Sequence, residues 1–173
     1  MRLIILIGVK GAGKTSVARL LGSRYRLPVY EADDAVEARL GASMRTLVVG
    51  RHPRLADAAR EEAARLLAGE GIVTLGASQP LDPATASAIA DARSRGAFVV
   101  ELYADLPAVS RREGLGAPRS VGLGAPRAQL MRLMKQARAA YASVADATVD
   151  TSALTPQEVA DDVARACRLA TDY

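Results

Sequence analysis

A glycine-rich octapeptide near the start of the chain constrains the fold more than any other feature of the sequence. Residues 8–15 read Gly-Val-Lys-Gly-Ala-Gly-Lys-Thr and fit the pattern G-x-x-x-x-G-K-[ST]. The apolar run 3–7 comes directly before them, and a helical pattern that begins at Ser16 follows. Glycines let the backbone turn tightly so that successive N–H groups surround phosphate oxygens, and the helix behind them adds its positive end. A strand, this loop and a helix therefore predict a phosphate-binding site.

Two side chains at the end of the octapeptide supply the chemistry of a nucleotide site. Lys14 can reach the β- and γ-phosphates, and the Thr15 hydroxyl can coordinate Mg²⁺. The alternative is a glycine-rich turn between a strand and a helix that binds nothing, and the complete pattern favours phosphate binding over it. The residues that we expect to contact the nucleotide here are Gly8, Gly11, Ala12, Gly13, Lys14, Thr15 and Ser16.

The rest of the chain alternates short strands with helices. The first strand is a continuous apolar run, which is typical of the middle of a parallel sheet covered on both faces. Strands are predicted at 3–7, 28–30, 72–75, 98–102 and 148–149, and helices at 14–25, 34–40, 44–49, 54–68, 83–94, 106–112, 128–143 and 156–169. This alternation predicts an α/β fold with a parallel sheet. The absence of any break in composition predicts one domain, residues 1–173.

Composition and charge exclude several classes of function. The net charge is +4, but the arginines are scattered among acidic residues along helices, which indicates solvated helix faces rather than a nucleic-acid surface. The chain has no Trp and one Phe, so it offers few aromatic side chains on which the bases of single-stranded nucleic acid could stack. The single cysteine, Cys167, excludes an intrachain disulfide and favours a reducing compartment. No apolar run reaches the length of a membrane span. We therefore expect a cytoplasmic monomer that binds neither nucleic acid nor a membrane.

Three acidic residues follow the second predicted strand. They are Glu31, Asp33 and Asp34. In open α/β sheets, ligands bind beyond the carboxyl ends of the strands, and these carboxylates lie at such an end. A carboxylate there can bind an acceptor hydroxyl, accept its proton or hold metal-bound water. The alternative is that Asp33 only caps the helix that begins near Asp34, and one residue can do both.

A short duplication interrupts the regular pattern. The hexapeptide Gly-Leu-Gly-Ala-Pro-Arg occurs at 114–119 and again at 122–127, so that each copy ends in an arginine, Arg119 and Arg127. One interpretation is a surface loop enlarged by duplication. In a protein that binds nucleotide phosphates we favour a mobile lid, at about 112–127, that brings an arginine to the transferred phosphoryl group.

The order of these features resembles the shikimate kinases over nearly the whole chain. The resemblance rests on the octapeptide, Tyr30-Glu31-Ala32-Asp33, Glu37, Gly41, the strand that ends in Gly76, the arginine-bearing lid, and Tyr141 followed by residues 145–151. It implies a P-loop kinase fold, a three-layer sandwich with a five-stranded parallel sheet and a mobile lid. It also implies that ATP and Mg²⁺ are used to phosphorylate shikimate on its 3-hydroxyl.

The resemblance assigns roles to single residues. It implies Lys14 on the phosphates, Thr15 on the magnesium ion, and Asp33 on the acceptor hydroxyls as base or orienting group. Glu31 falls where the family has an aspartate associated with the water shell of the metal. The remaining matches are the catalytic arginine of the lid and a residue that flanks adenine, and they fall at Arg119 and Pro156.

This chain departs from the family mainly on the acceptor side. Family members carry three consecutive glycines after the third strand, where residues 76–78 here read Gly-Ala-Ser. Counting back from this point places Leu55 at the position of one family arginine, so that Arg54 comes one residue early. Ala137 holds the position of another, so that Arg138 comes one residue late. On a helix one residue is a rotation of about 100°.

The displaced arginines leave the identity of the acceptor undecided. Shikimate carries a carboxylate, and bidentate pairing with arginine is the natural way to hold a carboxylate. The alternatives are a kinase of the same fold for another acceptor, such as a sugar acid or a nucleoside monophosphate, and a nucleotide-binding protein whose acceptor site has decayed. The residues that we expect to bind the acceptor are Asp33, Arg54, Gly76 and Arg138.

Overall fold

The computed structural model describes residues 3–114 and 124–169, and at 124–130 and 133 it describes the backbone alone. A five-stranded, all-parallel sheet runs through the molecule in the order β2-β3-β1-β4-β5. The strands are β1 Leu3–Ile7, β2 Val29–Glu31, β3 Gly71–Thr74, β4 Phe98–Tyr103 and β5 Ala147–Asp150. Because all strands run in one direction, the segments that follow β1, β2 and β3 meet at the same edge of the sheet.

Helices connect these strands. They are α1 Lys14–Tyr25, α2 Ala32–Leu40, α3 Met44–Val49, α4 Leu55–Leu67, α5 Pro83–Ser94, α6 Leu106–Arg112, α7 Gly124–Val144 and α8 Pro156–Cys167, with a 3₁₀ turn, η1, at Gln79–Leu81. N-cap side chains stabilise the starts of some of them. The Asp82 side chain accepts hydrogen bonds from the first turn of α5, and Thr155 and Glu158 form a reciprocal capping box on α8. No helix in the described part of the chain is both long enough and apolar enough to cross a membrane.

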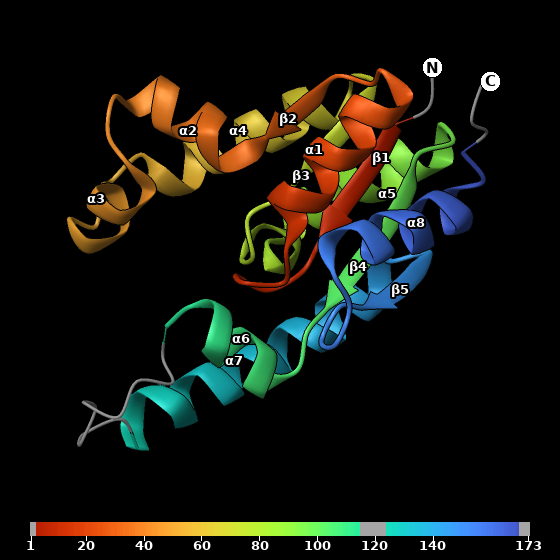
Figure 1. Ribbon diagram of the computed structural model, residues 1–173. Coiled ribbons are helices and arrows are strands. Elements are labelled where there is room, and N and C mark those ends of the chain that lie inside the picture. The colour runs from red at the N-terminus through yellow and green to blue at the C-terminus, as the bar shows by residue number, and fades with distance from the viewer. Residues whose placement is uncertain (1–2, 115–123, 170–173) are drawn as a thin grey trace.

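The sheet is buried on both faces, as the apolar first strand predicts. Ile4 and Leu6 of β1 pack in a core with α1, α6 and α8, whereas Ile5 and Ile7 face a second core with α4, α5 and α7. Of these helices, α1 and α8 are seen side by side on one side of the sheet in Figure 1. The predicted three-layer α/β sandwich is therefore confirmed.

A small third core supports α2 and α3, which project beyond the sheet at the left of Figure 1. Val36, Leu47 and Ala58 join α2, α3 and α4 in this core. Beside it, Arg39 of α2 pairs with the buried Glu62 of α4 at 3.1 Å. Because α2 begins directly after β2, these contacts fix the first turn of α2 relative to the sheet.

Several boundaries differ from the sequence predictions, among them the start of α2, which is Ala32 rather than Asp34. The long helix begins at Gly124 rather than at 128, since residues 124–127 form its first turn, where a proline is tolerated. The second strand is Val29–Glu31 rather than 28–30, and the turn η1 was not predicted. Most of the predicted lid, with Arg119, lies outside the described residues, as does the side chain of Arg127.

We expect Glu62→Gln to lower the free energy of unfolding at pH 7 by about 1–2 kcal/mol, because the buried carboxylate bonds both Arg39 and Arg65. The hydrogen bond from Arg65 is the main reason why the pKa of Glu62 lies below its ordinary value. The stabilisation is therefore complete above that ordinary value and is lost as the pH falls through the folded-state pKa.

Urea unfolding at neutral pH and at about pH 3 measures this effect, and the difference between variant and wild type should shrink in acid. Glu61→Gln is the matched control, since it removes a more exposed partner of Arg39 and should cost less than about 0.5 kcal/mol. An equal loss at both pH values would contradict the assignment.

Candidate active site

The loop between β1 and α1 presents backbone donors. Gly13 is the N-cap residue of α1, with φ of 95°, a conformation that favours glycine. Its side chain cannot cap the helix, and the first turn of α1 carries no acidic residue. The N–H groups at this helix start are therefore available to an anion, which the positive end of the helix also attracts.

Lys14 lies folded against this loop. Its Nζ donates hydrogen bonds to the carbonyl oxygens of Gly8 at 2.7 Å and Val9 at 3.2 Å. Burial lowers the pKa of Lys14 to about 8, against the opposing effects of the Asp33, Glu31 and Glu113 carboxylates. The ammonium group thus lies among three acidic groups at the entrance of the phosphate loop.

Thr15 and Glu31 provide hard oxygen ligands. The Thr15 hydroxyl donates to Glu31 Oε2 at 2.6 Å, and Arg19 Nη2 contacts Glu31 Oε1 at 3.0 Å. Hydroxyl and carboxylate oxygens suit Mg²⁺, which commonly takes the remainder of its shell from water and nucleotide phosphates. Among the described residues no group of three or more Asp, Glu, His or Cys side chains forms a cage for a metal ion. The donor set therefore fits a magnesium ion that arrives with a nucleotide.

Asp33 lies in the first turn of α2 and does not cap it, because the N-cap residue is Glu31. The carboxyl group packs on the backbone of Gly76, just after β3: a Cβ atom on Gly76 would lie 2.4 Å from Asp33 Oδ1. Burial raises the pKa of Asp33, Lys14 opposes this effect, and the nearby carboxylates of Asp34, Glu37 and Glu31 add to it. This half-buried carboxyl group has a raised pKa, which suits a proton acceptor.

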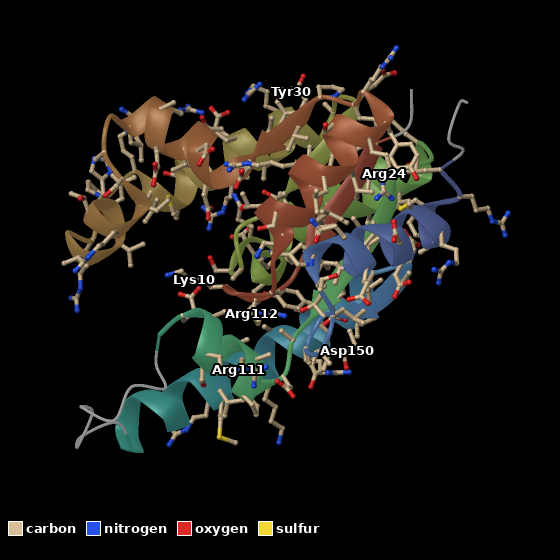
Figure 2. The ribbon with its side chains drawn as sticks, in the orientation of Figure 1. Lys10, Arg24, Tyr30, Arg111, Arg112 and Asp150 are labelled. Atoms are coloured by element: carbon tan, nitrogen blue, oxygen red, sulfur yellow. The ribbon has the colours of Figure 1, made fainter. Side chains whose placement is uncertain are left out.

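Arg112, at the end of α6, is a site residue that the sequence analysis did not single out. It donates to the carbonyl oxygen of Gly11 at 3.1 Å, and to the Thr151 hydroxyl at 3.0 Å. The neighbouring Glu113 pairs with Lys10 at 2.8 Å. Lys10 and Arg112, both labelled in Figure 2, lie where α6 meets the phosphate loop. The only signal for Arg112 in the sequence was its position at the start of the predicted lid.

A cavity of about 390 Å³ lies beside the loop, on the side of α8. Arg112 and Thr151 line it from one side, and Leu154 and Pro156 line it from the segment that leads into α8. Ala12, Gly13 and Ser16 of the phosphate loop and α1 also line it. Pro156, expected beside adenine, therefore lies in one cavity with the residues expected to bind the phosphates.

Known proteins of one family are similar to this chain over nearly its whole length. A family model described as shikimate kinase matches residues 10–168. The shikimate kinase of Salinispora tropica is 36% identical over 163 residues, which cover 92% of this chain and 94% of that protein. The shikimate kinase of Thermobifida fusca is 35% identical over 172 residues, which cover 98% of this chain and 97% of that protein. The chain belongs to the shikimate kinase family. The crystal structure of shikimate kinase from Aquifex aeolicus has the same fold, with a TM-score of 0.77 at 22% identity over 96% of each chain.

In this family member, the structure does not bring the two displaced arginines together with Asp33. Arg54 is exposed at the N-cap of α4, and its backbone N–H donates to His52 Nδ1 at 3.3 Å. The Arg138 guanidinium lies 4.2 Å above the ring of Tyr103. Neither arginine is among the described charges that act on Asp33. The reason at α7 is the helical rotation of one residue, since Ala137 faces the core.

We expect Gly76→Ala to lower kcat/KM for the acceptor by about 100-fold, because the new methyl group would displace the Asp33 carboxyl. The affinity for ATP should remain, since the phosphate loop is not touched. Gly69→Ala is the matched control: its Cβ would meet no atom of the described residues closer than 3.3 Å. Steady-state kinetics and ATP titrations measure both effects, and a Gly76→Ala protein with wild-type kinetics would contradict the contact.

We expect ATP binding above pH 8 to take up about one proton, because phosphate oxygens should recharge the partly neutral Lys14. Below that pH Lys14 is already protonated, so its share of the uptake disappears. Calorimetry in buffers of different ionisation enthalpy counts these protons. Lys10→Met, which removes the exposed lysine of the same loop, should keep the uptake. Proton uptake that does not depend on pH would exclude Lys14 as its source.

Proposed function

We propose that this chain transfers the γ-phosphoryl group of ATP to the 3-hydroxyl of shikimate. The observation that carries the proposal is the position of the Asp33 carboxyl group. It packs on Gly76 at the carboxyl edge of the sheet, and it interacts electrostatically with Lys14 of the phosphate loop. A proton acceptor therefore faces the phosphoryl donor, as membership of the shikimate kinase family leads us to expect.

On the donor side, the N–H groups at the start of α1 bind the phosphates, and Lys14 exchanges its two carbonyl partners for phosphate oxygens. Thr15 and Glu31 would hold Mg²⁺, which would offset the negative charge of the phosphates. Arg112 and Pro156 enclose the base of the nucleotide in the cavity beside α8.

On the acceptor side, the backbone at Gly76 and the Asp33 carboxylate orient the hydroxyl group. As its oxygen attacks the γ-phosphorus, the bond from that phosphorus to the β-γ bridging oxygen breaks, and the hydroxyl proton passes to Asp33. The pKa of Asp33, raised mainly by burial, makes this carboxylate a stronger base than one in water. Arg119 supplies positive charge to the transferred phosphoryl group from the lid.

Recognition of the shikimate carboxylate by Arg54 and Arg138 stays a prediction. The stacking of Arg138 on Tyr103 favours a second candidate function, in which a kinase of the same fold phosphorylates another hydroxylated acceptor. A sugar acid and a nucleoside monophosphate are the acceptors to test. The cytoplasmic location, the monomeric state and the absence of nucleic-acid binding also stay predictions from the sequence.

We expect the protein to release ADP from ATP and Mg²⁺ only when shikimate is added, with a phosphomonoester visible by ³¹P NMR. Asp33→Asn should lower kcat by about 10²–10⁴-fold, because the hydroxyl proton then lacks its acceptor. Asp34→Asn is the matched control, since the neighbouring carboxylate is exposed and should be dispensable.

A panel of acceptors separates the remaining possibilities. ADP release that is equal with and without shikimate would refute the proposal. Turnover with a sugar acid or a nucleoside monophosphate but not with shikimate would establish the second candidate. ATP binding without turnover across the whole panel would identify a nucleotide-binding protein with a decayed acceptor site.

A further inference from the structure

The turn that follows β3 is held by a buried glutamine. Gln79 is the first residue of η1 and is only 6% exposed. Its Oε1 accepts a hydrogen bond from the Gly76 N–H at 2.6 Å, and its own N–H donates to the Gly76 carbonyl oxygen at 3.0 Å. Gln79 thus satisfies both backbone groups of the residue that touches Asp33.

The same carboxamide reaches a second element. Gln79 Nε2 donates to the carbonyl oxygen of Ala59, in the middle of α4, at 3.3 Å. Only an uncharged side chain with a donor and an acceptor at its end can make both bonds, and glutamine provides them at the required reach. The bond ties the turn to α4, which Arg39 and Glu62 in turn tie to α2, the helix that carries Asp33.

A second side chain holds the turn from the opposite side. The hydroxyl group of Tyr141, a buried residue of α7, donates to the carbonyl oxygen of Ala77 at 2.6 Å. Side chains from η1 and α7 therefore bond the N–H of Gly76 and the carbonyl oxygen of the next residue, Ala77. This matters because Asp33 Oδ1 lies so close to the Gly76 Cα that no Cβ fits between them. A shift of the turn would move the surface against which the carboxyl group packs.

We propose that Gln79 is a positioning residue for phosphoryl transfer, whose carboxamide fixes the Gly76 peptide against the Asp33 carboxyl group and so sets the geometry of the acceptor site. This inference rests on the proposed function in taking Asp33 as the group that meets the acceptor. Among the described residues, no hydrogen bond joins Gln79 to the phosphate loop or to Asp33. Its effect should therefore fall on the acceptor and leave the nucleotide unaffected.

The substitution Gln79→Met keeps the length of the side chain and removes both hydrogen bonds. In the protein without ligands, NMR should show that the Gly76 amide exchanges at least about tenfold faster than in wild type. The nuclear Overhauser contact between Gly76 Hα and Asp33 Hβ should weaken. Gln136→Met, on an exposed position of α7, is the matched control and should change neither signal. Should Gln79→Met fail to fold, Gln79→Ala leaves room for water at the Gly76 N–H and is measured in the same way.

Kinetics then separate positioning from a general loss of structure. In Gln79→Met, kcat/KM for the acceptor should fall about 10–100-fold, whereas the Kd for ATP should change less than about twofold. A general loss of folded protein would lower the active fraction and leave KM for the acceptor unchanged. A folded Gln79 variant with wild-type exchange at Gly76 would overturn the inference. If wild type fails to phosphorylate shikimate, the proposed function fails, while the NMR measurements still decide the role of Gln79.

Discussion

The contact between the Asp33 carboxyl group and the Cα atom of Gly76 is the constraint on which the rest of the site depends. It exists because β2 pairs in parallel with β3, with Glu31 opposite Thr74, so that the residues after the two strands emerge side by side. Only glycine allows the approach, since a Cβ atom would lie 2.4 Å from Asp33 Oδ1. The pairing of two short strands thus places the Asp33 carboxyl group, and the missing side chain of Gly76 lets it lie close to the backbone.

Burial shifts both Lys14 and Asp33 towards their neutral forms. It lowers the pKa of Lys14 to about 8 and raises the pKa of Asp33, so that each group moves towards its neutral form. Their mutual attraction opposes both shifts, and this coupling ties the donor half to the acceptor half. A nucleotide would add negative charge beside Lys14 and restore its charge. The charge of Lys14 therefore depends on whether phosphates are bound, most of all near and above pH 8.

Residues outside the site hold its parts in place. Arg112 joins α6 to the phosphate loop, and Gln79 joins the turn after β3 to α4. The acceptor side differs from the expectation raised by the family, because Arg138 stacks on Tyr103 and not beside Asp33. Membership of the shikimate kinase family and the identity of the acceptor are therefore separate questions. The first follows from similarity along the whole chain, and the second depends on a few side chains around Asp33.

The phosphate loop, helix α1 from Lys14 to Tyr25, the parallel α/β sheet and the family could all be predicted from the sequence. Each shows as a pattern of residues that are contiguous in the chain. It misplaced the start of α7, where Pro126 suits a first helical turn as well as a loop. The tertiary structure alone decided that Asp33 packs on Gly76, that Gln79 holds that glycine, and which way Arg138 points. These outcomes depend on packing between segments far apart in the chain, which no local pattern encodes; the sequence indicated the one-residue shift of Arg138 but not its stacking on Tyr103.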